Sequence, residues 1–139
     1  MEQTQKKYSK LNILLWVLQI LFALLYVGAG FSKTVKPIPE LALQVPWVVT
    51  FPAALVRFIG ISELLGAIGL ILPAALKIRP QLTTLAASAL SFVMLLANVF
   101  HIYQGEFQVL PMTGIIFILL TFTAYGRWKL APFTSKGKQ

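Results

Sequence analysis

The chain has 139 residues, of which 58% are hydrophobic and only 12% charged, and its mean hydropathy is +0.79. An ordinary soluble domain carries about twice that share of charged residues, roughly 25%. The length fits one domain, covering residues 1–139. The chain has no cysteine, which excludes disulfides, thiol redox couples and thiolate metal sites. Its single histidine and four acidic residues argue against an intrachain metal centre.

The net charge of +8 is compatible with a protein that binds nucleic acid. However, the cations lie beside apolar segments, which is typical of proteins that meet the anionic surface of a membrane. We therefore expect a lipid bilayer, and not nucleic acid, as the environment of this chain.

Four apolar segments predict membrane-spanning helices at residues 11–31, 52–72, 82–100 and 111–125. The first three reach about 28–32 Å, close to the thickness of the hydrocarbon core. The fourth reaches only about 22 Å, which predicts local thinning of the bilayer or help from flanking residues. The first segment is too long to favour the rival interpretation, a cleaved secretory signal. The sequence thus predicts an all-α membrane protein, a bundle of four transmembrane helices.

The connection at residues 32–50 is not a simple polar loop. It contains Pro37, Pro39 and Pro46 among apolar residues, and Trp47 suits headgroup depth. This composition favours a short interfacial segment between the first two spans, with a lid over an outward-facing pocket as the alternative. Proline also follows the second span, where Pro73 and Pro80 predict the ends of a short hairpin.

The loop charges predict the orientation of the bundle. The basic tails 1–10 and 127–139 and the second loop place nine cations on one side: Lys6, Lys7, Lys10, Lys77, Arg79, Arg127, Lys129, Lys136 and Lys138. The other side receives Lys33 and Lys36, offset by Glu40 and Glu106. The positive-inside rule then predicts that both termini are cytoplasmic, in a plasma or bacterial inner membrane.

Polar residues recur at helical spacing within the first and third spans. Gln19, Tyr26 and Lys33 share one face of the first span, and Ser91, Asn98 and His101 share one face of the third. Counted from the cytoplasmic ends, Gln19, Glu63 and Ser91 fall near mid-membrane, Tyr26, Arg57 and Asn98 lie higher, and Lys33 and His101 lie near the outer boundary. This agreement predicts an outward-opening polar column, with Glu63 at its floor.

A carboxylate in the middle of an apolar helix costs at least a few kcal/mol, so Glu63 needs a partner or a function. We expect it to bond to Gln19, Ser91, a water or a ligand, or to be protonated. Lys33, Arg57 and His101 would form a cationic mouth suited to an anionic group or a quinone head. The alternative is structural: a hydrogen bond from Glu63 fixes the helix register, while Arg57 and Lys33 extend to lipid head groups.

Several segments resemble one family. They are Gly-Ala-Gly-Phe-Ser-Lys at 28–33, Arg-x-x-Gly-x-x-Glu-x-x-Gly from Arg57, Leu-Thr-Thr-Leu-Ala-Ala at 82–87, Asn-Val-Phe-His at 98–101 and Tyr-Gly-Arg at 125–127. Together they are similar to the DoxX-like family of small membrane proteins, over roughly residues 11–128. The resemblance implies a four-helix bundle with Lys33, Glu63 and His101 as its characteristic polar residues. Members of the family have been tied to quinone-linked sulfur oxidation, to membrane complexes of oxidative stress and, in animals, to receptor assembly.

Two functional hypotheses follow. In the first, the pocket around Glu63 binds a small lipophilic or anionic ligand, with a quinone as the candidate cofactor, in an accessory subunit of a membrane oxidoreductase complex. In the second, the protein is an assembly module or chaperone for other membrane proteins. A proton-coupled carrier is a weaker alternative, and the absence of cysteine argues against independent sulfur oxidation.

Independent catalysis is not expected, because no nucleophile–base pair or cofactor motif is present. The small residues Ser62 and Gly66 permit close helix packing and are compatible with a homo-oligomer.

Overall fold

The computed structural model describes residues 2–79 and 81–132, with side chains from residue 9 onward. Within these residues every regular element is a helix and there is no strand. The elements are α1 (Glu2–Val35), α2 (Ile38–Gln44), η1 (Pro46–Thr50), α3 (Ala53–Leu76), α4 (Gln81–Gln104), η2 (Phe107–Val109), α5 (Leu110–Tyr125) and η3 (Gly126–Leu130). The predicted all-α fold is confirmed, and a short helix, α2, does occupy the connection after the first span.

Four helical stretches are long and apolar enough to cross a membrane: Ser9–Val35, Ala53–Leu76, Gln81–Gln104 and Phe107–Leu130. All four predicted spans are confirmed, and each is longer than predicted. The prediction of a short fourth span was wrong, because that helix starts with η2 and continues past Tyr125 through the π-helical turn η3 to give 24 residues. No thinning of the bilayer is needed for a helix of about 36 Å.

The role predicted for Pro73 also needs correction. Pro73 lies inside α3, which continues for three residues to Leu76 and stops where Lys77 adopts a left-handed conformation (φ 54°). The amide of Ile78 donates to the Pro73 carbonyl at 3.1 Å, the long bond of a Schellman turn. Pro80, and residues 133–139 of the predicted basic tail, lie outside the described residues.

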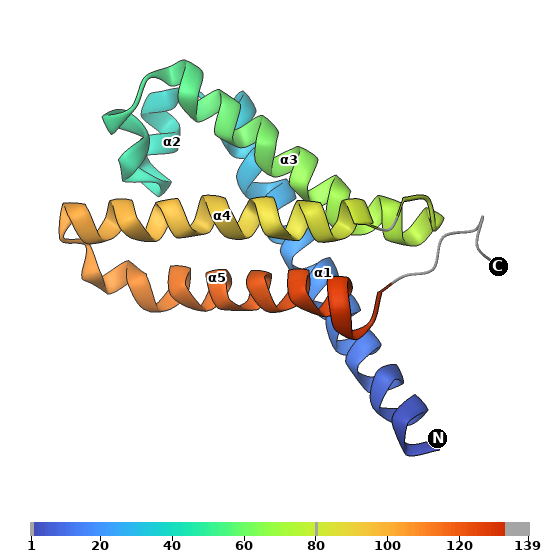
Figure 1. The fold of residues 1–139 in the computed structure, drawn as a ribbon. Coiled ribbons are helices and arrows are strands. Elements are labelled where there is room, and N and C mark those ends of the chain that lie inside the picture. The colour runs from blue at the N-terminus through green and yellow to red at the C-terminus, as the bar shows by residue number, and fades with distance from the viewer. Residues whose placement is uncertain (1, 80, 133–139) are drawn as a thin grey trace.

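The spanning helices pack in chain order, as Figure 1 shows. α1 packs along α3, α3 along α4 and α4 along α5, whereas α1 and α5 touch at few positions. The buried core includes Leu18, Phe22, Tyr26, Ala67, Leu70, Ala87, Leu90, Leu120 and Ala124. We call the end of the molecule with α2, η1 and η2 the α2 end, and the opposite end, with the turn after α3 and η3, the hairpin end.

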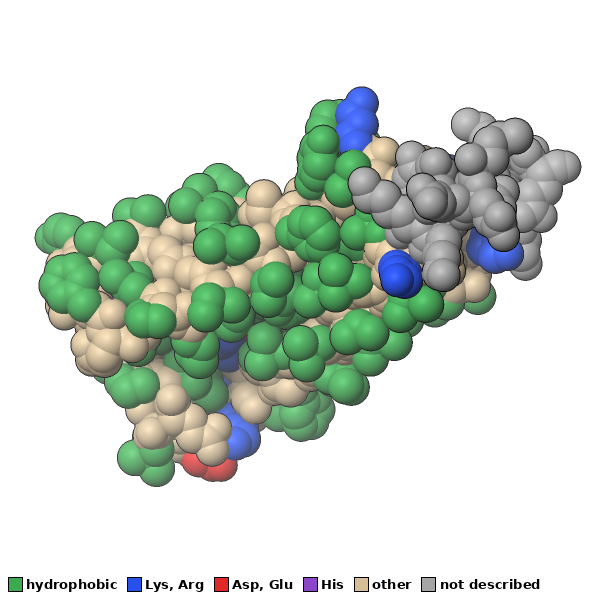
Figure 2. Space-filling model, turned by 90° about the horizontal axis from the view of Figure 1, so that it is seen from below, with side chains coloured by type: hydrophobic (Ala, Val, Ile, Leu, Met, Phe, Trp, Pro, Cys, Tyr) green, Lys and Arg blue, Asp and Glu red, His purple; other side chains and the backbone are tan. Residues whose placement is uncertain are grey.

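Large apolar side chains face outward on every spanning helix, for example Leu24, Leu65, Leu85 and Ile118, each more than 60% exposed. Figure 2 shows one face of the molecule covered mainly by hydrophobic side chains, with few charged ones among them. Such a surface is far larger than the apolar patches of soluble proteins and is suited to lipid. The chain is an integral membrane protein.

The segment α2–η1 folds over the α2 end of the bundle. Leu41, Val48 and Val56 form a small, fully buried cluster that fixes this segment against the start of α3. An aromatic chain runs on from Trp47 through Phe51 to Phe100 of α4, with ring centroids 5.9 and 5.3 Å apart. The segment therefore covers the ends of α1 and α3.

Candidate functional site: a buried ion pair between α1 and α3

Two glycines bring α1 and α3 into backbone contact. A Cβ added to Gly30 would lie 2.7 Å from the Gly60 carbonyl oxygen, and one added to Gly60 would lie 2.9 Å from the Gly30 carbonyl oxygen. Only glycine permits this approach. Each glycine is followed three residues later by a charged residue, Lys33 on α1 and Glu63 on α3, which therefore lies on the same helix face.

Lys33 and Glu63 form an ion pair at this crossing. The Lys33 ammonium donates to both carboxylate oxygens of Glu63, at 2.9 and 2.8 Å, and the residues are only 8% and 6% exposed. The antiparallel geometry explains the match, because side chains tilt toward the N-terminus of their own helix. Lys33 thus leans toward the hairpin end, while Glu63 leans toward the α2 end. An isolated charge at this depth would cost far more than a pair does.

Residues of the α2 end close the pair from above. The Arg57 guanidinium donates from Nη1 to the Lys33 carbonyl at 2.8 Å, satisfying an otherwise free carbonyl in the last turn of α1. The Trp47 ring lies 5.8 Å from the Lys33 ammonium, at the outer limit of a cation–π contact. Lys33, Glu63 and Arg57 together leave one net positive charge at this end.

Tyr26 lies on the same face of α1 as Lys33, about two helical turns closer to the hairpin end. Its side chain is 3% exposed, and its hydroxyl has no hydrogen-bond partner among the described residues. A buried hydroxyl without a partner is costly and usually indicates a water or ligand group that satisfies it.

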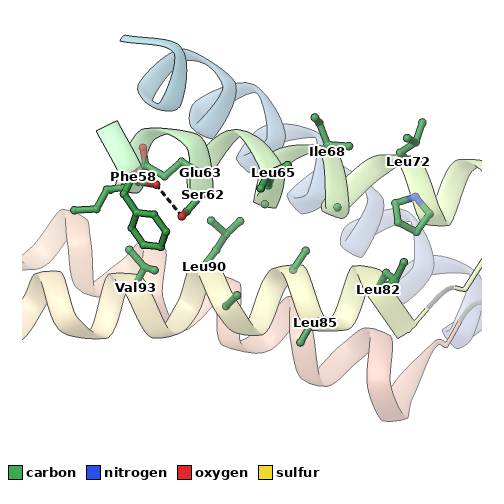
Figure 3. Close-up of a pocket in the computed structure, with 16 residues that line it drawn as sticks. Phe58, Ser62, Glu63, Leu65, Ile68, Leu72, Leu82, Leu85, Leu90 and Val93 are labelled. Carbon is green, nitrogen blue, oxygen red and sulfur yellow. Dashed lines mark hydrogen bonds between the residues drawn. The ribbon is translucent and has the colours of Figure 1, made fainter. Parts of the chain in front are cut away.

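A cavity of about 510 Å³ runs between α3 and α4 and has Glu63 in its wall. Figure 3 shows its course: Phe58, Ser62 and Glu63 lie at one end, and Leu72 and Leu82 at the other. The Ser62 hydroxyl is bonded to the Phe58 carbonyl at 2.8 Å, and the remaining lining is almost entirely apolar. The volume lies within the range of small-molecule sites. All of its lining residues belong to α3 and α4, and none to α2, η1 or η2.

The other polar residues singled out in the sequence lie elsewhere. Gln19 donates to the Leu70 carbonyl at 2.6 Å and accepts from Arg127 Nε at 2.6 Å, near the hairpin end. The prediction that Gln19 and Glu63 lie at the same membrane depth is wrong, because the Gly30–Gly60 contact puts Glu63 opposite the last turns of α1. The expected Glu63 partners, Gln19 and Ser91, are replaced by Lys33.

The polar residues of α4 bond to α5 and its preceding loop. Ser91 shares a 2.6 Å hydrogen bond with Thr121, Asn98 accepts from the Thr113 hydroxyl at 2.8 Å, and the His101 ring bonds through Nδ1 to Glu106 at 2.6 Å. The predicted single polar column is therefore divided. Lys33, Glu63, Tyr26 and Arg57 are brought together between α1 and α3, whereas Ser91, Asn98 and His101 belong to the α4–α5 interface.

The sequence alone did not identify Arg127 as a buried structural residue. The Arg127 guanidinium, 3% exposed, donates to Gln19 and, at 2.7 Å, to the Asn12 side chain. Arg127 appears in the sequence as one more flanking cation. The available signal was Asn12, a polar residue inside the first apolar span, which needs a partner there.

The sequence was also compared with known proteins. No curated protein and no solved structure matched it. A family model described as the DoxX-like family matches residues 17–123, which include the paired glycines, Lys33, Glu63 and the cavity. The chain belongs to the DoxX-like family.

Proposed function

We propose that this protein binds a small lipophilic or anionic ligand beside the Lys33–Glu63 pair, and acts as an accessory subunit of a membrane redox or stress-response complex. A quinone is the cofactor to test first. We place the protein in the plasma or bacterial inner membrane, with both termini in the cytoplasm. The accessory role rests on what is known of the family. The ligand site rests on geometry.

The observation that carries the proposal is the polar end of the α3–α4 cavity. Glu63 and Ser62 are the polar residues in the wall of a cavity that α3 and α4 otherwise line with apolar residues. Both helices expose apolar side chains, so we expect a lipophilic molecule to enter the cavity sideways from the bilayer. Ligand sites of this kind combine apolar walls with a few polar groups that fix the orientation of the ligand.

The polar groups match a head that both donates and accepts hydrogen bonds. Each Glu63 oxygen takes one bond from Lys33 and keeps capacity to accept another from a ligand hydroxyl. The net positive charge of Lys33, Arg57 and Glu63 favours a carbonyl, an oxyanion or a carboxylate close by. The Tyr26 hydroxyl, which has no partner among the described residues, lies on the α1 side and is not part of the cavity lining. A quinone–quinol pair offers both kinds of group.

The test is native mass spectrometry of the protein extracted gently in its own lipids, followed by titration with ubiquinone-1. We expect one retained or added quinone per chain, and at least tenfold weaker binding in Glu63→Gln. A charge-swapped variant, Lys33→Glu with Glu63→Lys, retains an ion pair for the fold but reverses the groups that face the ligand. Loss of binding in the folded, charge-swapped protein separates a ligand site from a structural pair. Unchanged affinity in both variants would sink the proposal.

A second candidate function, an assembly module, is favoured by a different observation. Gly28 on α1 and Gly114 on α5 have nothing within 4 Å of the position that a Cβ would occupy. Another transmembrane helix, from a second copy or another membrane protein, can therefore approach the backbone there. Gly28→Leu should then abolish a co-purifying subunit or a homo-oligomer while leaving quinone binding unchanged. If this function holds alone, Glu63→Gln lowers thermal stability and no ligand is found.

A further inference from the structure

The α3–α4 cavity continues well beyond its polar end. Its lining runs on α3 from Phe58 to Pro73, about 22 Å along the helix, and on α4 from Leu82 to Val93. Between Leu65 and Pro73 it is lined only by apolar residues, and within this stretch Gly66 and Gly69 pack closely against Leu90 and Ala86 of α4. This apolar stretch runs lengthwise along α3 and α4, the direction in which an acyl chain would lie. This stretch belongs to the same cavity as the Glu63 end but lies beyond it, and the inference below rests on its apolar lining and on the cations next to it, not on a ligand at Glu63.

The hairpin end of this groove carries two exposed cations. Lys77 lies four residues after Pro73, the last α3 residue of the lining, and Arg79 lies two residues before α4 begins at Gln81. Both residues have left-handed backbones, with φ of 54° and 44°. This conformation is unfavourable for residues with a Cβ and common for glycine. No acidic residue lies between Glu63 and Glu106 to neutralise these charges.

We propose that an anionic phospholipid, of the leaflet that faces the α3–α4 hairpin, binds here. Its phosphate lies at Lys77 and Arg79, and one acyl chain lies in the groove between Leu65 and Pro73. The direction is set by charge and depth. A phospholipid keeps its head group at the membrane surface, where the two cations lie, and its chain extends from there toward the middle of the bilayer. The groove starts at that surface and runs in that direction.

The experiment uses the purified full chain in detergent, with phosphatidylglycerol or phosphatidylcholine added at equal concentration and bound lipid counted by native mass spectrometry. We expect one tightly held phosphatidylglycerol and weaker retention of phosphatidylcholine. The double variant Lys77→Gln and Arg79→Gln should weaken phosphatidylglycerol binding by about fivefold for each charge removed. Both side chains are exposed, so the helices remain intact. Equal retention of the two lipids, or full retention in the double variant, would overturn the proposal.

A second pair of variants tests the chain. Ala89→Phe fills the groove, whereas Ser88→Phe adds the same ring to the adjacent exposed position, which does not line the groove. We expect Ala89→Phe to lose phosphatidylglycerol and Ser88→Phe to keep it. Phosphatidylglycerol with a photoreactive acyl chain provides a measurement on the unmodified protein, with labelling expected on α3 and α4 around Leu85. Retention in Ala89→Phe, labelling confined to α1 and α5, or a protein subunit held in the groove with no lipid would each refute it.

Discussion

Lys33 and Glu63 show how a residue that is costly alone becomes acceptable in a membrane. Each is more than 90% buried, and each satisfies the charge of the other through two short hydrogen bonds. The pair stabilises the crossing less than its Coulomb attraction suggests, since both ions lose their hydration. Its larger effect is on the register in which α1 and α3 pack, because any other register would leave Lys33 and Glu63 buried as unpaired charges, at a high cost in free energy.

The first prediction concerns this pair. Lys33→Met should lower the free energy of unfolding by about 3–5 kcal/mol, because it leaves the Glu63 carboxylate buried and unpaired. The double variant Lys33→Met with Glu63→Leu should recover most of that loss, since no charge then remains to be compensated. Thermal unfolding in a mild detergent provides the comparison. A double variant as unstable as the single one would show that the pair contributes substantial net stability.

At the scale of the elements, the Gly30–Gly60 contact determines how α1 meets α3. The contact lets the two backbones approach, which places the Gly-x-x-Lys motif of one helix opposite the Gly-x-x-Glu motif of the other. Because the helices are antiparallel, the two charged side chains converge. The close approach also positions Lys33 beneath Trp47, so the α2–η1 segment closes the site from the α2 end.

The second prediction tests the helix contact. Gly60→Ala places a methyl group 2.8 Å from both the Lys33 Cβ and the Thr34 hydroxyl oxygen, and should destabilise the protein by about 1–3 kcal/mol through overpacking. Gly28→Ala is the matched control on α1. It meets nothing within 4 Å and should be neutral or stabilising by about 0.5–1 kcal/mol, because alanine is the better helix former. The melting temperatures of the two variants should therefore move in opposite directions. Similar melting temperatures would show that the helices can separate at no cost.

At the scale of the whole molecule, the two ends of the bundle are held by different polar networks. The α2 end has the ion pair and its cover, while at the hairpin end Arg127 joins α1 to the last turn of the chain's fourth span. The residues joined there are more than a hundred positions apart in the sequence. α1 otherwise touches α5 at few positions, so this network holds α1 against η3 at the hairpin end.

The third prediction follows from that network. Arg127→Met removes the donors to Gln19 and Asn12, and the Gln19 oxygen, left buried without a donor, costs about 1–3 kcal/mol. Hydrogen exchange in residues 11–20 should rise severalfold as α1 opens locally. Lys129→Met removes the same charge from an exposed neighbour and should change little. Equal exchange in the two variants would contradict a structural role for Arg127.

The fourth prediction concerns orientation. Because the chain has no cysteine, single cysteines can report which side of the membrane a residue faces. We expect a membrane-impermeant maleimide to label Gln104→Cys on intact cells, and Lys77→Cys only after permeabilisation, as the excess of cations on the hairpin side requires. The reverse pattern would place both termini outside.

The sequence alone determined the class, the number of spans and the polar residues of interest, because hydrocarbon tolerates only continuous apolar helices and leaves each charge conspicuous. The prolines and the tryptophan of residues 32–50 also indicated a short segment between the first two spans, where α2 is found. It did not determine that Lys33 and Glu63 pair, or that Gln19 and Ser91 lie elsewhere. Depth counted along one helix ignores the offset at which two helices cross, and here the contact of Gly30 with Gly60 sets that offset. The true length of the fourth span was likewise a tertiary matter, since Arg127 lies inside the helix bundle only because Gln19 and Asn12 of α1 are there to receive its hydrogen bonds.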